Sequence, residues 1–289
     1  DFYVQSDCGA TNGISGWSIP VEFSTPCPAA LAGNYTIGAT GDYTTISAAI
    51  ADLNACGVSA AVTFDILTGS GPYNERLTLN EVTGASATNT ITFNGNGETI
   101  TSTTDTSNRS LFLLDGADYV TLNDMNFVTQ DDTNNFVIQL TNGANFNSIT
   151  NNTIDLTSAI NNTGSTNAGI VLSGSLTSAT TDGDNGNVTI TGNTIISGYY
   201  GITISGQSTG SALNNNISNN EIRDFHYYGI YLNDVSSTNI ENNELHRPTR
   251  VAPNVFYGIY MTGNSEANLI NANELHDAFT GDTADTSTA

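Results

Sequence analysis

The sequence Ser218-Asn-Asn-Glu-Ile-Arg-Asp-Phe-His-Tyr-Tyr-Gly-Ile-Tyr-Leu-Asn-Asp234 begins again, in part, as Ile240-Glu-Asn-Asn-Glu-Leu-His246. Its Gly-Ile step recurs at intervals of 32, 28 and 29 residues, at Gly169-Ile170, Gly201-Ile202, Gly229-Ile230 and Gly258-Ile259. Its Asn-x-apolar step recurs at Asn152-Thr-Ile154, Asn193-Thr-Ile195, Asn220-Glu-Ile222, Asn243-Glu-Leu245 and Asn273-Glu-Leu275, with a looser copy at Asp124-Met-Asn-Phe127. A repeat of this length with variable loops predicts a solenoid.

Each repeat predicts short strands rather than helices. Apolar residues alternate over short runs, as in Ile202 and Ile204 or Ile230 and Leu232, and Gly and Asn separate the runs. A strand and its copy one repeat later pair in parallel, so stacked repeats bury one continuous inner face. The Gly-Ile-x-Leu and Asn-Asn-x-Ile phrases resemble those of the right-handed parallel β-helix. The resemblance covers most of the chain and implies an all-β solenoid.

The recurring Asn predicts a structural ladder. An amide side chain at the same turn of each repeat can stack on its copy in the next repeat, and Asn also tolerates left-handed backbone. Neither role needs catalysis.

Composition limits the classes of partner. The chain of 289 residues has 28 acidic and 5 basic residues, which gives a net charge of −23. Nucleic acid is not an expected partner, because binding it needs clustered Lys or Arg. The acidity favours solubility or cation binding. No apolar run is long enough to span a membrane, and the absence of a signal peptide and of an initial Met predicts a longer precursor.

Three regions are expected along the chain. Residues 1–27 alternate like two strands joined by a turn and resemble the end of a fibronectin type III sandwich, as found in tandem on bacterial surface proteins. Residues 28–34 are a predicted linker, and residues 35–289 are the predicted β-helix.

Cys8 and Cys27 can form a disulfide, which would imply an oxidising compartment. Cys56 is then a buried thiol, although three cysteines leave the pairing open.

A short amphipathic helix is predicted at the head of the β-helix. Asp42 or Thr44 can cap its start, and Gly57 ends it. One helical face is apolar and consists of Ile46, Ala49, Ile50 and Leu53. A helix in this place covers the otherwise open end of the core.

The same region resembles the opening coil of pectin methylesterases and related β-helix proteins, in Asp42-Tyr-Thr-Thr-Ile-x-x-Ala-Ile50 and Pro72-Tyr-Asn-Glu-Arg76. The family's catalytic parts are a Gln, two Asp and an Arg on central coils. Gln130-Asp131-Asp132-Thr133 is similar to one catalytic phrase, but the Asp-Phe-Ile-Phe-Gly phrase and the Arg-bearing segment have no counterpart. The opening coil is a folding device and carries no activity by itself.

One step of the Asn repeat lengthens to 41 residues, which predicts an excursion at residues 173–187. This excursion contains Asp182, Asp184, Asn185 and Asn187, whose oxygen atoms, separated by Gly, suit calcium. The Glu that completes a helical calcium loop is missing, and Asp, Asn and Gly also make ordinary polar turns. Calcium binding and a plain turn are both left open.

Aligning the Asn turns of the last coils predicts one outer patch of charged side chains. Glu221, Glu244 and Glu274 form one column, and Arg223, His246 and His276 form another, with Arg247, Asp224 and Asp277 at the edge. Side chains two apart on a strand point the same way, and neighbouring strands lie about 4.8 Å apart. The patch can bind a metal or act as acid and base on a sugar chain. Alternatively, it is charge compensation between stacked coils.

A second set of columns is aromatic. Tyr231 and Tyr260 are predicted to point outward, since Ile230 and Leu232 face inward. Before each Gly lie Tyr200, Tyr228 and Tyr257, and one residue earlier lie Tyr199, Tyr227 and Phe256. Stacked outward tyrosines can be a platform for sugar rings, or they can cover the shoulder of the coil.

These features together resemble the large repeat adhesins of bacteria that export proteins through a type 9 pathway. The resemblance implies an extracellular, cell-surface protein with a structural or adhesive role, which binds glycan or another surface ligand without catalysis. The alternative is a polysaccharide-active enzyme, lyase or esterase-like, that uses Glu244, His246, Glu274 and His276. The sequence ends without a closing cap, which predicts further domains of a longer chain or neighbouring copies as partners.

Overall fold

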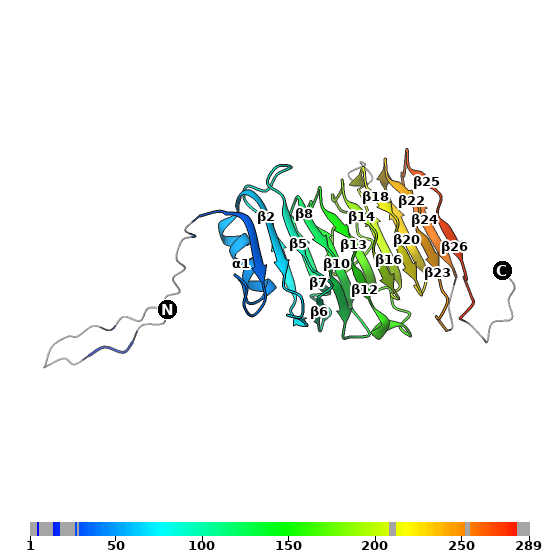
Figure 1. The fold of residues 1–289 in the computed structure, drawn as a ribbon. Coiled ribbons are helices and arrows are strands. Elements are labelled where there is room, and N and C mark those ends of the chain that lie inside the picture. The colour runs from blue at the N-terminus through cyan, green and yellow to red at the C-terminus, as the bar shows by residue number, and fades with distance from the viewer. Residues whose placement is uncertain are drawn as a thin grey trace.

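The computed structural model describes residues 5, 14–17, 27, 29–207, 212–251 and 255–281. Within these residues the strands form three long parallel sheets around one core, as a right-handed parallel β-helix (Figure 1). The predicted fold class is therefore confirmed. The predicted fibronectin-like strands of residues 1–27 lie almost entirely outside the described residues.

Successive coils pass through the three sheets in the same order, and we call these sheets I, II and III. In the described part of the chain, sheet I contains β1 (Leu31–Ile37), β2 (Val58–Ile66), β5 (Ile91–Asn94), β8 (Val120–Asn123), β11 (Ser148–Thr150), β14 (Thr189–Thr191), β18 (Asn216–Ser218), β22 (Asn239–Glu241) and β25 (Leu269–Asn271). Sheet II contains β3 (Tyr73–Asn74), β6 (Thr99–Ser102), β9 (Asn126–Thr129), β12 (Thr153–Asp155), β15 (Thr194–Ile196), β19 (Glu221–Arg223), β23 (Glu244–His246) and β26 (Glu274–His276). Sheet III contains β4 (Leu77–Asn80), β7 (Ser110–Asp115), β10 (Asn135–Thr141), β13 (Asn167–Leu172), β16 (Tyr200–Ser205), β20 (Tyr228–Asn233) and β24 (Tyr257–Thr262). Outside these sheets lie the helical turn η1 (Thr157–Ala159) and the short pair β17 (Ala212–Leu213) and β21 (Val235–Ser236).

The repeated Gly-Ile step aligns from coil to coil in sheet III. Register partners along the sheet are Ile170, Ile202, Ile230 and Ile259. A Cβ atom on Gly229 would lie 2.4 Å from Leu245 Cδ2 and 2.6 Å from the carbonyl oxygen of Gly258. The repeat keeps Gly at this position because sheet II and the next coil already occupy the space that a side chain would need.

The predicted Asn ladder is present. The hydrogen bonds of the ladder and the left-handed backbone belong to two adjacent residues. The ladder consists of Asn152, Asn193, Asn220, Asn243 and Asn273, and each Nδ2 donates to the Oδ1 of the next Asn at 2.9–3.0 Å. The left-handed backbone lies one residue earlier, as at Asn219 and Asn242, where φ is 56°. In the Asn-Asn pair, the first residue therefore turns the chain and the second bonds one coil to the next.

The predicted cap is helix α1 (Ile46–Cys56). Thr45, and not Asp42 or Thr44, caps its start, since the Thr45 side chain accepts a hydrogen bond from the Ala48 N–H. Gly57, with φ 66°, follows its end as predicted. The buried residues are the predicted Ile46, Ala49, Ile50 and Leu53. Among the described residues, no helix has the length and apolar character to cross a membrane.

Two features of the N-terminal region differ from what the sequence suggested or resolve what it left open. Strand β1 begins at Leu31, inside the predicted linker 28–34, and pairs in parallel with β2. Cys27 forms a disulfide with Cys56 and not with Cys8, with 5.3 Å between the two Cα atoms. Because Cys27 precedes β1 and Cys56 ends α1, the bridge ties the entry strand to the cap helix.

The last coil, at the other end of the solenoid (Figure 1), carries exposed apolar side chains. Ile270 and Leu275 are 51% and 47% exposed, whereas their register partners Ile240 and Leu245 in the preceding coil are buried, and Leu269 is 47% exposed beside them. A covering partner at this edge stays a prediction.

Candidate functional site

The predicted charged columns lie on the outer face of sheet II in the last coils. Register partners are Glu221, Glu244 and Glu274 in one column and Arg223, His246 and His276 in the other. The residues between them, Ile222 and Leu245, are fully buried, so the alternation of a strand turns the charged side chains outward. Arg223 lies 3.3 Å from Glu221 and 3.5 Å from Asp224.

Ion pairs join neighbouring coils within this patch. His246 Nε2 lies 3.3 Å from Glu221 Oε1, and His276 Nε2 lies 3.0 Å from Glu244 Oε1. Hydrogen bonds to Asp277 and then to Glu244 raise the pKa of His276. Each of these pairs compensates charge between coils when its histidine is protonated.

The three residues predicted at the edge of the patch differ in burial, although the buried Asp224 still pairs with Arg223. Arg247 and Asp224 are fully buried, and only Asp277 lies with the outer side chains. The Arg247 guanidinium lies 4.8 Å from the ring centroid of Phe256 and 5.1 Å from that of Phe279, and burial lowers the pKa of Arg247 to about 10. Asp224 accepts hydrogen bonds from backbone N–H groups of the following coil. Both side chains hold the turn between sheets II and III together.

The aromatic columns form a surface on sheet III that we call the tyrosine wall. The wall consists of Tyr199, Tyr200, Tyr227, Tyr228, Tyr231, Tyr257 and Tyr260. Tyr231 and Tyr260 are nearly parallel, with ring centroids 5.6 Å apart and planes 17° apart. Tyr228 contacts both of them edge to face, at 5.2 Å each. The outer pair thus lies on an inner row of stacked rings, which fixes its orientation.

The tyrosine wall adjoins the charged patch. Burial raises the pKa of Tyr231, and it raises that of Tyr228 to about 12. Residues 224–227 join β19 to β20, so the two surfaces meet at one turn. Phe256 does not continue the outer column as predicted, because its ring turns inward and packs on Phe225 at 5.1 Å.

The four predicted calcium ligands differ in their surroundings. Asp182 and Asp184 are exposed. Asn185 is buried, and its Oδ1 accepts a hydrogen bond from a backbone N–H of an earlier coil at 3.0 Å. The Asn187 Oδ1 accepts a hydrogen bond from an Asn side chain of the next coil at 3.2 Å. The side chains of Asn185 and Asn187 therefore make hydrogen bonds within the protein, as expected in an ordinary polar turn. Calcium binding here stays a prediction.

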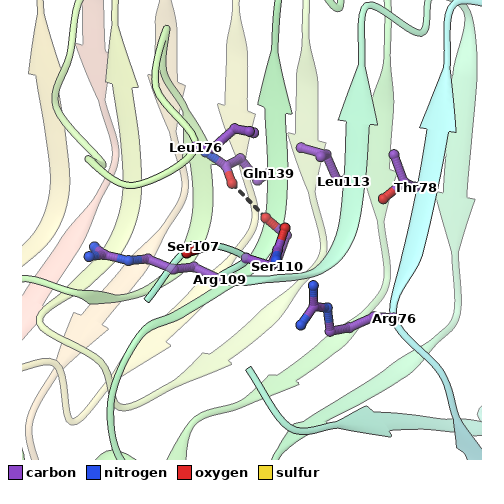
Figure 2. Close-up of a pocket in the computed structure, with 9 residues that line it drawn as sticks. Arg76, Thr78, Ser107, Arg109, Ser110, Leu113, Gln139 and Leu176 are labelled. Carbon is purple, nitrogen blue, oxygen red and sulfur yellow. Dashed lines mark hydrogen bonds between the residues drawn. The ribbon is translucent and has the colours of Figure 1, made fainter. Parts of the chain in front are cut away.

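A recess on sheet III, near the start of the solenoid, was not predicted (Figure 2). Its lining consists of Arg76, Thr78, Ser107, Asn108, Arg109, Ser110, Leu113, Gln139 and Leu176. Arg76 pairs with Asp105 at 3.2 Å, whereas Arg109 lies over the ring of Phe136 and its buried Nε has no hydrogen-bond partner among the described residues. The lining contains two of the five basic residues of the chain and no carboxylate, so it can donate hydrogen bonds to hydroxyl or anionic groups. Because the chain has only five basic residues, Arg76 and Arg109 were the feature of the sequence that could have indicated this recess.

One comparison with known proteins, a match to a family model, supports the fold. The family model described as right handed beta helix region matches residues 209–281. A structure of the pectin methylesterase from Aspergillus niger in deglycosylated form is similar over 90% of this chain and 93% of that chain, with 15% identity and a TM-score of 0.48. A second structure, in penultimately deglycosylated form, is similar over 93% of each chain, with 14% identity and a TM-score of 0.47. A likeness at this level carries no argument about activity. No match is found among curated proteins.

Proposed function

We propose that this protein is a structural and adhesive module that binds glycan through the tyrosine wall, without turnover. The observation that supports this most is the outward pair Tyr231 and Tyr260, whose parallel rings repeat from one coil to the next. A sugar ring has an apolar C–H face that stacks on an aromatic ring, and rings held by neighbours lose little conformational freedom on binding.

The proposal includes an extracellular, cell-surface location on a bacterium with type 9 export, next to fibronectin type III domains. The Cys27–Cys56 disulfide supports an oxidising compartment. The net charge of −23 supports a soluble surface that does not bind polyanions.

The test is binding of neutral and acidic polysaccharides, measured by affinity electrophoresis and calorimetry, with Tyr231→Ala and Tyr260→Ala combined. We expect the double variant to lose affinity about tenfold or more, which corresponds to about 1.4 kcal/mol. Phe146→Ala is the matched control, since Phe146 is an aromatic residue that is 48% exposed and stacks on Tyr119 outside the wall. Equal binding by the double variant and the wild type would contradict the proposal.

The second candidate is a polysaccharide-active enzyme, and the contact between His276 Nε2 and Glu244 Oε1 favours it. Such a pair can move a proton to or from a sugar. Glu274 lies in the same column, but it makes no ion pair among the described residues. Release of products from pectin or another acidic glycan, lost in His246→Ala, would establish the enzyme and exclude binding without turnover.

A further inference from the structure

Glu244, His246 and His276 form a cluster with the composition of a metal site. One ligand atom from each residue lies within 4.8 Å of the others, and this is the one such group of three among the described residues. We propose that these three side chains bind a divalent transition-metal ion of the Zn²⁺ class. This site is independent of the proposed glycan binding.

Two neighbouring coils bring the three side chains together. His246 on β23 and His276 on β26 are register partners, and their ring centroids lie 4.8 Å apart with planes tilted by 34°. Glu244 precedes His246 by two residues and therefore faces the same side of the sheet. The Glu244 Oε1 lies 3.0 Å from His276 Nε2 and 3.9 Å from His246 Nε2.

These separations are close to those that Zn²⁺ requires. In a tetrahedral site with bonds of about 2.0–2.1 Å, two ligand atoms lie about 3.3 Å apart. The two separations from Glu244 Oε1 lie on either side of that value, and all three ligand atoms lie within 4.8 Å of one another, so side-chain rotations would have to draw the two imidazoles onto one ion. Glu221 Oε1, which lies 3.3 Å from His246 Nε2, or a water molecule can complete the coordination.

Asp277 orients one ligand in the manner typical of metal sites. His276 Nδ1 lies 2.9 Å from Asp277 Oδ2, and Thr280 Oγ1 donates to the other oxygen of this carboxylate at 3.0 Å. A ligating imidazole commonly donates its second N–H to a carboxylate, which fixes the tautomer and directs the other nitrogen to the metal.

The contacts of the two ring nitrogens of His276 are compatible with a bound cation. Both ring nitrogens face carboxylate oxygens, of Asp277 and of Glu244, and carboxylates only accept. A neutral imidazole has one N–H and can serve only one of them. A metal ion between Nε2 and Glu244 would satisfy both atoms at this contact.

The chemistry of the three ligands indicates which class of metal ion the site would bind. Two imidazole nitrogens with a carboxylate suit Zn²⁺, Ni²⁺ or Cu²⁺, whereas Ca²⁺ and Mg²⁺ prefer oxygen ligands throughout. The side chains of His246, His276 and Glu244 are 12%, 33% and 47% exposed, so an ion can enter from solvent. The acidic surface raises the local concentration of cations.

The test is calorimetric titration of the chelator-treated protein with ZnCl₂. We expect one saturable Zn²⁺ site that neither Ca²⁺ nor Mg²⁺ competes for. His246→Ala, His276→Ala and Glu244→Gln should each weaken binding at least about tenfold, and Asp277→Asn, which removes no ligand, should weaken it roughly tenfold. The matched control is Glu241→Gln on β22, which removes the same charge on sheet I and should bind Zn²⁺ as the wild type does.

Thermal denaturation shows whether a loss of Zn²⁺ binding in a variant arises from a loss of folding. Glu244 and His276 are partly exposed, so the melting temperatures of Glu244→Gln and His276→Ala without metal should be close to that of the wild type. Zn²⁺ should raise the melting temperature of the wild type and of Glu241→Gln, but not of His246→Ala or His276→Ala. Absence of a saturable Zn²⁺ site, or unchanged affinity in both His variants, would overturn the proposal.

Discussion

At the residue scale, His226 is the histidine that takes no part in the charged patch. It is 4% exposed, and its Nδ1 has no hydrogen-bond partner among the described residues. Its ring lies against Tyr199 and Tyr227, and Arg247 and Arg250 are the charged groups that face it. Burial and then these two arginines lower the pKa of His226 to about 4. The buried ring is therefore neutral in the folded protein.

This depressed pKa links stability to pH. In the unfolded chain His226 titrates near its ordinary pKa of 6.5, so between pH 6.5 and pH 4 the unfolded state binds more protons than the folded state. His226 should therefore reduce the free energy of unfolding as pH falls through this window, by roughly 3 kcal/mol. Urea denaturation of the wild type and of His226→Phe at several pH values tests this. The difference between the two proteins should change between pH 6.5 and 4 and stay constant above pH 7.

A pH-independent difference between these two proteins would show that His226 has no depressed pKa in the folded state. Comparing two proteins removes the contribution of the carboxyl groups that titrate in the same range.

At the scale of elements, the Asn ladder joins the turns of successive coils. The Asn220 Oδ1 accepts from both the backbone N–H and the Nδ2 of Asn193, and the Asn220 Nδ2 donates to Asn243 and to the carbonyl of Ile190. All of these bonds are buried, so removing one amide leaves several polar groups without partners.

We expect Asn220→Ala to lower the free energy of unfolding by about 3 kcal/mol, because each buried group left without a partner costs about 1–3 kcal/mol. The matched control is Asn242→Gly in the next turn. Asn242 is exposed, with φ 56°, and its side chain has no hydrogen bond among the described residues. Glycine adopts this backbone freely, so the control should change stability by less than about 0.5 kcal/mol. Equal effects of the two changes in urea denaturation would contradict the ladder's role.

At the scale of the whole molecule, the solenoid is a stack in which each coil contacts only its neighbours, so its ends are its weakest parts. The N-terminal end has α1 over the core and the Cys27–Cys56 bridge beside it, whereas the last coil exposes Leu269 and Ile270. The disulfide should therefore protect the first coil against local opening.

Cys56→Ser should lower the free energy of unfolding by about 3–4 kcal/mol in the chain-entropy account, for the 29-residue separation of the bridge. Hydrogen exchange should show the loss of protection first in β1 and α1. Cys8→Ser is the control and should leave stability unchanged. Peptide mapping without reduction provides a direct check, and a Cys8–Cys27 linked peptide would contradict the bridge.

The side chains of the candidate site that lie on paired strands were predictable from the sequence. The columns through Glu244 and His246 follow from the repeat, because register partners in parallel strands lie side by side. The segment between β23 and β24 was not predictable. Arg247 and Phe256 lie at its two ends, and both turn inward, since packing against Phe225 outweighs the polarity expected of a turn.

The sequence by itself determined the solenoid, its inner face, the cap helix and the outward rows, since each follows from a period that a single strand or helix imposes on its side chains. Only the tertiary structure decided the pairing of Cys27 with Cys56, the burial of Arg247 and the recess between Arg76 and Arg109. These depend on distances between segments far apart in the chain, which are set by loop paths and side-chain rotamers, and no repeat in the sequence encodes them.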